Sequence, residues 1–165
     1  MDAAVVRRGR RSDSKELIKL VVALARFEKL DPPSATAKRR LLDDIFRKKR
    51  VHLFVASQGR RLVGYALYFY SYSSFLAKPT LYLEDLFVSA ERRGSGVGTE
   101  LLRRCAEEAL RKACGRMEWA VLTWNEEALG FYESIGAERM AGWYLYRLDE
   151  KSISSFAGGS IPTGR

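Results

Sequence analysis

The sequence has few of the residues that build metal sites and disulfides. It contains two cysteines and one histidine in 165 residues. Cys105 and Cys114 fall within one expected helix, where their spacing at about 100° per residue places them on opposite faces, so the two thiols are not expected to pair. His52 has no clustered cysteine or histidine beside it in the sequence. A metal site is therefore not expected, and neither is metal-assisted hydrolysis.

Long apolar runs are also missing. No stretch approaches the roughly 20 residues that span a bilayer, and the N-terminus lacks the apolar core of a signal peptide. At 47% hydrophobic and 30% charged residues, the composition is that of a folded chain rather than a disordered one. We expect a soluble, cytoplasmic protein without a membrane partner. Residues 1–150 should form a single domain with one core, and residues 151–165 a loosely ordered tail.

Acidic residues are outnumbered by basic ones, and the formal net charge is +9. This excess favours a phosphate-bearing partner, although a solvated basic surface without a ligand accounts for it equally well. Nucleic acid is an unlikely partner, because the arginine clusters lack the interleaved aromatic residues of a single-strand binder.

Hydrophobic periodicity predicts helices and strands in an irregular alternation. Asp13 and Glu16 have the spacing of a capping box ahead of the first helix, and Asn125 can cap a short helix that continues through Ser134. The first helix is expected at about residues 14–30, and the second begins near residue 36. The third is expected from the end of the glycine-rich loop to about residue 114, and the fourth from the Asn125 cap to Ser134. Strands are expected at 5–8, 51–56, 62–70, 80–88, 117–124 and 143–148.

A glycine-rich loop lies between an expected strand and an expected helix, an arrangement that holds phosphate through backbone N–H groups and the helix dipole. A Walker-type loop would need a lysine that is absent here, and a dinucleotide fingerprint would need glycine or alanine at Thr99. What remains is Arg-x-x-Gly-x-Gly at Arg93, Gly96 and Gly98. Such a turn can be purely structural, so the loop alone does not establish a ligand.

Further motifs in a fixed order accompany the loop. They are Tyr82-Leu83-Glu84-Asp85 before it, and Trp124-Asn125 and Phe131-Tyr132 after it. With these motifs the sequence resembles the GNAT superfamily of N-acetyltransferases over residues 3 to 150, and within it the spermidine/spermine and thialysine N-acetyltransferases. The resemblance implies an α/β fold with a mixed, mostly antiparallel sheet of about six to seven strands and about four flanking helices. It also implies acetyl-CoA as cosubstrate and a homodimer.

The resemblance places two catalytic side chains. An amine of pKa about 10.4 is neutral in roughly one molecule in 2,500 at pH 7, so its deprotonation needs a positioned base. Glu84 is the expected base, directly or through water, and Tyr132 the expected acid that protonates the departing thiolate. In a regular strand Asp85 would point to the face opposite Glu84, so it is not expected to share this role. Structural alternatives are an exposed strand glutamate and a core tyrosine.

The resemblance also assigns binding residues. The coenzyme is expected to contact Leu86, Phe87, Val88, Arg93, Gly94, Ser95, Gly96, Val97, Gly98, Thr99, Asn125 and Tyr132. The amine is expected to contact Glu28, Glu84, Phe27 and Trp124. For residues 86 to 88 the backbone N–H groups should make the contacts, so their side chains carry little information.

The expected acceptor is the primary amine of a small diamine, a polyamine or a lysine-like substrate such as thialysine. Ala141 stands where the polyamine-acetylating relatives carry a glutamate. One acidic contact for a long polycation is therefore missing, which favours a shorter amine. The alternatives are a protein N-terminus or lysine side chain as acceptor, and a non-catalytic module that only binds acyl-CoA.

Overall fold

The chain separates into two compact units, Met1–Ala120 and Val121–Arg165. The computed structural model describes residues 4–159. The expected single domain of residues 1–150 crosses the boundary between the units, and its limits stay a prediction. Among the described residues, none of the helices combines the length and apolar character needed to cross a bilayer.

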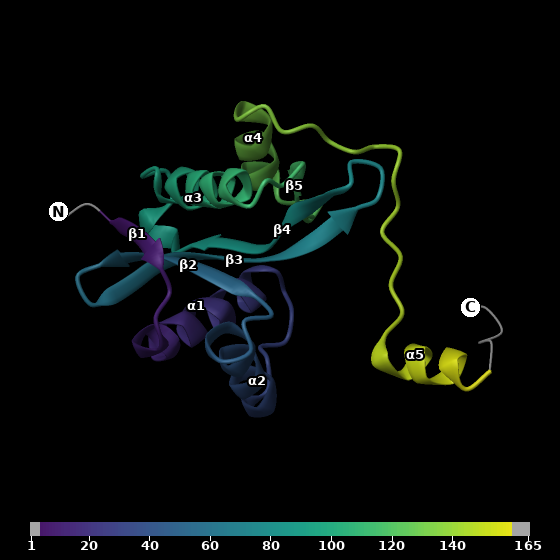
Figure 1. Cartoon of the computed structure of the whole chain (residues 1–165). Helices are drawn as coiled ribbons and strands as arrows, with labels where there is room; N and C mark the ends of the chain where they lie inside the picture. The colour runs from purple at the N-terminus through teal and green to yellow at the C-terminus, as the bar shows by residue number, and fades with distance from the viewer. Residues whose placement is uncertain (1–3, 160–165) are drawn as a thin grey trace. The chain divides into compact units, whose positions relative to one another are not determined.

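The first unit is built on a five-stranded sheet in the order β1-β2-β3-β4-β5 (Figure 1). Its strands are β1 Val5–Arg8, β2 His52–Gln58, β3 Arg61–Ser73, β4 Lys78–Val88 and β5 Arg116–Glu118. The pairs β1–β2, β2–β3 and β3–β4 are antiparallel, and the pair β4–β5 is parallel. The mixed, mostly antiparallel α/β architecture is confirmed. The expected six to seven strands are wrong for the described residues, which form five strands together with five α-helices rather than about four.

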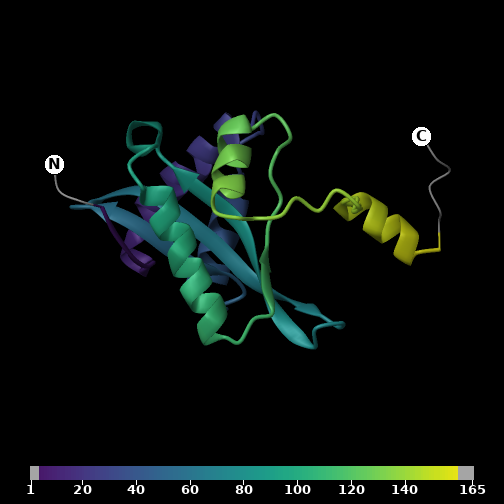
Figure 2. The same cartoon turned by 90° about the horizontal axis from the view of Figure 1, so that it is seen from above.

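Helices cover both faces of this sheet (Figure 1). Helices α1, Ser14–Phe27, and α2, Ala35–Phe46, lie on one face, and α3, Val97–Arg111, lies on the other. Figure 2 shows α3 in front of the strands with the first two helices behind them. Leu17 and Leu20 of α1 pack with Tyr65, Leu67 and Phe87 of the sheet in one buried core. The α1 face therefore carries an apolar core layer of the unit.

The expected capping box at Asp13 is wrong. A short 3-10 helix, η1 (Arg11–Asp13), precedes α1. The Asp13 side chain accepts a hydrogen bond of 2.7 Å from the Arg10 backbone N–H at the start of η1, and it makes no capping hydrogen bond to α1. Its carboxylate instead accepts two hydrogen bonds from Arg7, at 2.8 and 2.9 Å. This pairing with the Arg7 guanidinium holds the pKa of Asp13 below its usual range. The Asp13 side chain, which the local motif assigned to the end of α1, is thus paired with Arg7 on the preceding strand.

A buried carboxylate anchors α3 to the sheet. Glu108 is 5% exposed and accepts hydrogen bonds from Arg8 of β1 at 2.7 Å and from the Tyr70 hydroxyl of β3 at 2.8 Å. Arg111 adds two hydrogen bonds from the next helical turn. Burial disfavours the ionised form, but the hydrogen bonds from Arg111 and Tyr70 hold the pKa of Glu108 at about 2. The helix that begins at the glycine-rich loop is thus tied to two strands near its C-terminal end.

The second unit contains α4, Glu126–Ser134, and α5, Glu150–Ala157. The expected strand at 143–148 is wrong: these residues form no regular element, and Trp143 is 77% and Tyr146 90% exposed. A strand needs a hydrogen-bonding neighbour, and residues 121–159 contain no other strand to provide one. Most of the described part of the expected loose tail forms α5, with Asp149 as its N-cap, and the looseness of this tail stays a prediction. Residues 160–165 of that tail lie outside the described residues.

Candidate active site

The centre of β4 contains a β-bulge at Glu84. In the antiparallel pairing of β3 with β4, Leu67 lies opposite Asp85 and Tyr68 lies opposite Leu83, so Glu84 has no partner residue on β3. An extra residue of this kind bends the strand and redirects the side chains around it. The Glu84 side chain is exposed. The predicted base therefore stands at the irregular point of the longest antiparallel ladder.

The bulge changes which residues of β4 face α1. Leu83 pairs with Tyr68, whose hydroxyl accepts a hydrogen bond from Arg8 on the α3 side of the sheet. Asp85 instead accepts a hydrogen bond of 2.9 Å from the hydroxyl of Tyr65, a residue in the core beneath α1. In a regular strand, residues 83 and 85 would share a face.

The expectation that Asp85 turns away from Glu84 is therefore wrong. It assumed unbroken alternation, and the extra residue in the bulge moves Asp85 to the α1 side. There it interacts electrostatically with both Glu84 and Glu28.

Three carboxyl groups thus form an acidic cluster, which comprises Glu28, Glu84 and Asp85. Burial raises the pKa of Asp85 to about 6, against the hydrogen bond from Tyr65 and with smaller contributions from Glu84 and Glu28. Burial likewise raises the pKa of Glu28, and the nearby Glu84 adds to this effect. Carboxylates that are partly desolvated and repel one another are stabilised by a cation. The cluster is suited to an ammonium ligand.

Glu28 and Phe27 lie at the C-terminal end of α1. Glu28 caps the helix, and its backbone N–H donates to the Leu24 carbonyl at 2.9 Å. The Arg93 guanidinium carbon lies 4.6 Å from the centre of the Phe27 ring and 5.9 Å from that of Phe87. This cation–π contact brings the first residue of the predicted coenzyme motif onto the predicted amine-binding segment.

The glycine-rich loop leads directly into α3. Gly94 and Gly96 have positive φ angles of 69° and 82°, and Gly96 is the N-cap of the helix. L-residues with a side chain rarely adopt this conformation, so the two positions require glycine. A Cβ atom built at either position would meet no atom within 4 Å. The space above the loop is therefore open, and the unpaired N–H groups of the first turn of α3, which includes Thr99, can receive an anion.

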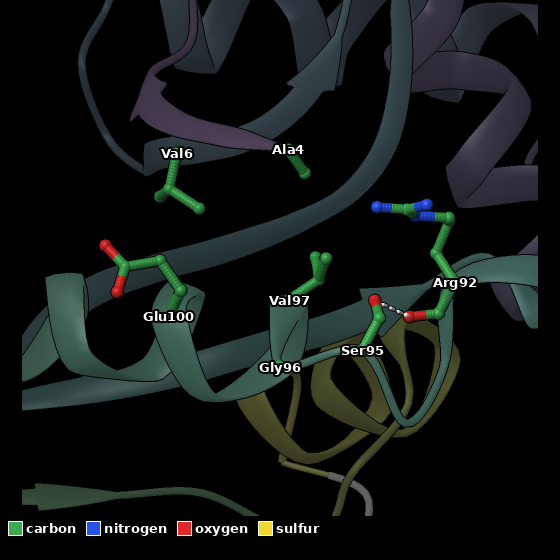
Figure 3. Close-up of a pocket in the computed structure, with 7 residues that line it drawn as sticks. All are labelled: Ala4, Val6, Arg92, Ser95, Gly96, Val97 and Glu100. Carbon is green, nitrogen blue, oxygen red and sulfur yellow. Dashed lines mark hydrogen bonds between the residues drawn. The ribbon is translucent and has the colours of Figure 1, made fainter. Parts of the chain in front are cut away.

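A cavity of about 200 Å³ lies between this loop and β1 (Figure 3). It is lined by Ala4, Val6, Arg92, Ser95, Gly96, Val97 and Glu100. The Ser95 hydroxyl donates to the Arg92 carbonyl at 2.6 Å, which closes the turn. The cavity is smaller than the roughly 300 Å³ of the smallest typical ligand pockets, so it can take only a small group. Three predicted coenzyme residues line it, and Arg92 joins them as one that the sequence reasoning missed.

The second half of β4 has one unpaired edge within residues 4–120. Strand β5 pairs only with Thr80, Leu81 and Tyr82. The following residues, which include the predicted Leu86, Phe87 and Val88, bind β3 on the other edge. The Phe87 side chain is 6% exposed and belongs to the core, so it can contact a ligand only through its backbone. The expected backbone contacts of residues 86–88 with the coenzyme stay a prediction.

The remaining predicted residues lie in the second unit. Asn125 caps α4 as expected, because its side-chain oxygen accepts a hydrogen bond from the Ala128 N–H at 3.2 Å. Tyr132 lies on the same helix with its ring 5.3 Å from that of Phe131. Burial raises the pKa of Tyr132 to about 12, so its phenol stays protonated at neutral pH. Trp124 precedes the cap and is 45% exposed.

The structure brings together Phe27, Glu28, Glu84 and Arg93 in the first unit. Tyr132, Asn125 and Trp124 belong to the second unit and are close in the sequence around one helix. Among residues 4–159, no three His, Cys, Asp or Glu side chains are close enough to share a metal ion, so the carboxyl groups of the acidic cluster interact electrostatically without forming a metal site. Asp85 of the acidic cluster and its hydrogen-bond partner Tyr65 are residues that the sequence analysis did not assign to the site. Adjacent acids in a strand are the only signal that could have indicated the bulge.

Comparison with known proteins agrees with this geometry. The sequence profile of the Acetyltransferase (GNAT) family matches residues 17–137. The chain is 34% identical to the thialysine N-epsilon-acetyltransferase of Mus musculus over 170 aligned residues, which cover 96% of this chain and 99% of that protein. It is 42% identical to an L-ornithine N5-acetyltransferase of Arabidopsis thaliana over 94 residues, or 57% of this chain and 41% of that protein.

Solved structures share the fold. An integron cassette protein from the mobile metagenome of V. cholerae superimposes with a TM-score of 0.80 at 23% sequence identity. The superposition covers 95% of this chain and 99% of that one.

Proposed function

The chain belongs to the acetyltransferase (GNAT) family and is an acetyl-CoA-dependent N-acetyltransferase, and we propose that its acceptor is a short primary amine that carries a second charged group, such as a lysine-like amino acid. The observation that carries this proposal is the acidic cluster of Glu28, Glu84 and Asp85 on the α1 side of the β4 bulge. Three interacting carboxyl groups favour a cationic ligand over a neutral one.

The coenzyme would bind along the adjacent loop. The open space above Gly94 and Gly96 allows the pyrophosphate to approach the backbone, and the N-terminus of α3 favours its charge. Arg92 and Arg93 immediately precede Gly94 in this loop and add positive charge. The unpaired N–H groups of β4 after Tyr82 would hold the pantetheine arm and the acetyl carbonyl, which requires no particular side chains there.

The chemistry then needs one base and one acid. We assign the base to Glu84, which takes a proton from the ammonium group, so that the neutral nitrogen attacks the thioester carbonyl carbon. The new C–N bond forms, the C–S bond breaks, and Tyr132 donates its proton to the departing sulfur. The nitrogen loses its second proton to solvent, and Tyr132 is reprotonated from solvent, which leaves the neutral amide and the free thiol. The oxyanion that develops on the carbonyl would be stabilised by backbone donors of β4, a contribution typically worth about 3 kcal/mol.

We infer a short substrate because the second unit has no carboxylate at position 141. Ala141 is exposed and offers no carboxylate where polyamine-acetylating enzymes of this family carry a glutamate. The net charge of +9 repels a polycation further. The relatives named above act on thialysine and L-ornithine, which are amino acids with one side-chain amine. We also propose that the protein forms a homodimer.

The proposal is tested by release of coenzyme A from acetyl-CoA, followed with DTNB. The amine panel contains thialysine, lysine, ornithine, short diamines, spermidine, spermine and a peptide with a free N-terminus. We expect the highest kcat/KM with a lysine-like amino acid or a short diamine. Release of coenzyme A only with the peptide would indicate that the protein acetylates protein N-termini instead. Binding of acetyl-CoA by calorimetry without release for any amine would indicate a non-catalytic module.

A further inference from the structure

Tyr65 is a buried tyrosine that the mechanism above does not use. Its side chain is 0% exposed, and its ring packs in the core beneath α1, 6.3 Å from the ring of Phe87 on the neighbouring strand. Tyrosine in such a position normally finds a partner for its hydroxyl. Here the partner is a carboxylate oxygen, Oδ2 of Asp85, at 2.9 Å.

The position of Tyr65 in the ladder explains this contact. Tyr65 lies opposite Phe87 in the pairing of β3 with β4. Asp85 is two residues earlier on β4, and the bulge at Glu84 has turned it toward the α1 face. A tyrosine side chain can reach such a diagonal neighbour. Because the Tyr65 ring is fixed by the core, its hydroxyl also fixes the Asp85 carboxylate. Oδ1 of Asp85 makes no hydrogen bond to any residue within 4–159.

We propose that Tyr65 is a positioning residue for substrate binding: its hydroxyl holds Oδ2 of Asp85, so that the free Oδ1 accepts a hydrogen bond from the ammonium group of the amine. This inference rests on the proposed amine site and adds the residue that orients it. Tyr65 itself does not touch the substrate. Its role is to present one oxygen of a carboxylate in a fixed direction, which lowers the ordering cost of binding.

The hydrogen bond also affects the charge of Asp85. The charged and titratable groups that face Asp85 are Tyr65 from β3, Glu84 from its own strand and Glu28 from the end of α1. Burial and these two acids favour the protonated form, and the Tyr65 hydroxyl is the one neighbour among them that favours the ionised form. Burial and the nearby Asp85 raise the pKa of Tyr65 well above its usual value, so the hydroxyl remains a donor.

Two phenylalanine variants separate this role from core packing. Tyr65→Phe removes the donor and keeps the ring. Tyr68→Phe is the matched control, because Tyr68 is also 0% exposed and lies on the same strand, but its hydroxyl meets Arg8 on the opposite face. Both variants lose one buried hydroxyl. Only the first should change the ionisation of Asp85.

The first measurement does not depend on activity. Carbon-13 NMR of the side-chain carboxyl groups follows each aspartate against pH, and the Asp85 signal is the one missing in Asp85→Asn. We expect its midpoint near pH 6 in the wild type and in Tyr68→Phe, and about one to two pH units higher in Tyr65→Phe. An unchanged midpoint in Tyr65→Phe would overturn the inference.

The second measurement is the pH profile of kcat/KM for the best amine of the panel. Because the three carboxyls are coupled, the acid limb reports the cluster as a whole. In Tyr65→Phe we expect this limb to move to higher pH, with KM for the amine raised about tenfold at pH 7 and KM for acetyl-CoA unchanged. Near pH 9, where Asp85 is ionised but no longer held by Tyr65, KM for the amine should recover only in part. A uniform loss of kcat at every pH would mean a structural role only. Absence of turnover in the wild type would instead refute the proposed function. The NMR midpoints would still show whether Tyr65 controls the ionisation of Asp85.

Discussion

Asp85→Asn should make the protein more stable and a poorer enzyme. The substitution keeps the shape of the side chain and an oxygen that can accept the Tyr65 hydrogen bond, and it removes the charge. Burial and the neighbouring acids raise the pKa of Asp85 from its ordinary 3.8 to about 6. A shift of about two units corresponds to about 3 kcal/mol of unfavourable free energy for the ionised form in the folded state.

The sign of the effect follows from the raised pKa. Stability contributed by a carboxyl with a raised pKa is fully present below its unfolded value and is lost as pH rises through the folded value. Wild-type stability should therefore fall between about pH 4 and pH 6 relative to the variant. At pH 7 to 8 Asp85→Asn should be more stable by about 1 to 3 kcal/mol, and at pH 4 the two proteins should be equal.

The same change should impair binding of the amine. Loss of a charge-assisted hydrogen bond of about 1.5 to 3 kcal/mol corresponds to a decrease in kcat/KM of roughly tenfold to a hundredfold. Urea unfolding at pH 4, 6 and 8 and DTNB kinetics give the two readouts. Asp13→Asn is a control of opposite sign, because pairing with Arg7 lowers the pKa of Asp13 and its loss should destabilise at pH 8. If Asp85→Asn is less stable than the wild type at pH 8, the argument from burial is wrong.

Three further results are expected. Gly98→Ala places its Cβ 3.7 Å from Val88, an ordinary contact, so the variant should fold normally yet bind acetyl-CoA at least tenfold more weakly by calorimetry. Gly96→Ala should in addition lose about 1 kcal/mol of stability because of its positive φ. Unchanged affinity in both variants would mean that the loop does not bind the coenzyme. Tyr132→Phe should lower kcat by about 10² to 10⁴ with little change in Tm, whereas normal turnover with a lower Tm would make it a core residue. Ala141→Glu should improve spermidine selectively, by about 0.5 to 1.5 kcal/mol and less at high salt; spermine as the best wild-type substrate would contradict the reasoning.

Local sequence patterns predicted most of the first unit. The strand at residues 5–8 is confirmed to the residue, and the glycine-rich loop does connect β4 to α3. The Asn125 cap is also confirmed. These features depend on neighbouring residues and on backbone conformation, which periodicity and capping rules describe well.

Features that depend on a partner in another element were not predictable in this way. Asp13 has the sequence signature of a helix cap, but Arg7 on β1 binds it instead. Residues 143–148 have strand-like composition, yet the described part of their unit gives them no strand to pair with. Propensity describes what a segment can form, and the partner decides what it does form.

The bulge at Glu84 is a feature that the sequence pattern did not predict and that changes which side chains lie at the proposed site. Strict alternation puts Glu84 and Asp85 on opposite faces, which leaves one acid for the site and one for the other side of the sheet. One extra residue relative to β3 puts both acids within electrostatic reach of Glu28. The cost of gathering these charges appears as the raised pKa of Asp85, and a bound ammonium group would relieve it. The irregularity that sequence periodicity could not predict is therefore the feature on which the proposed amine site depends.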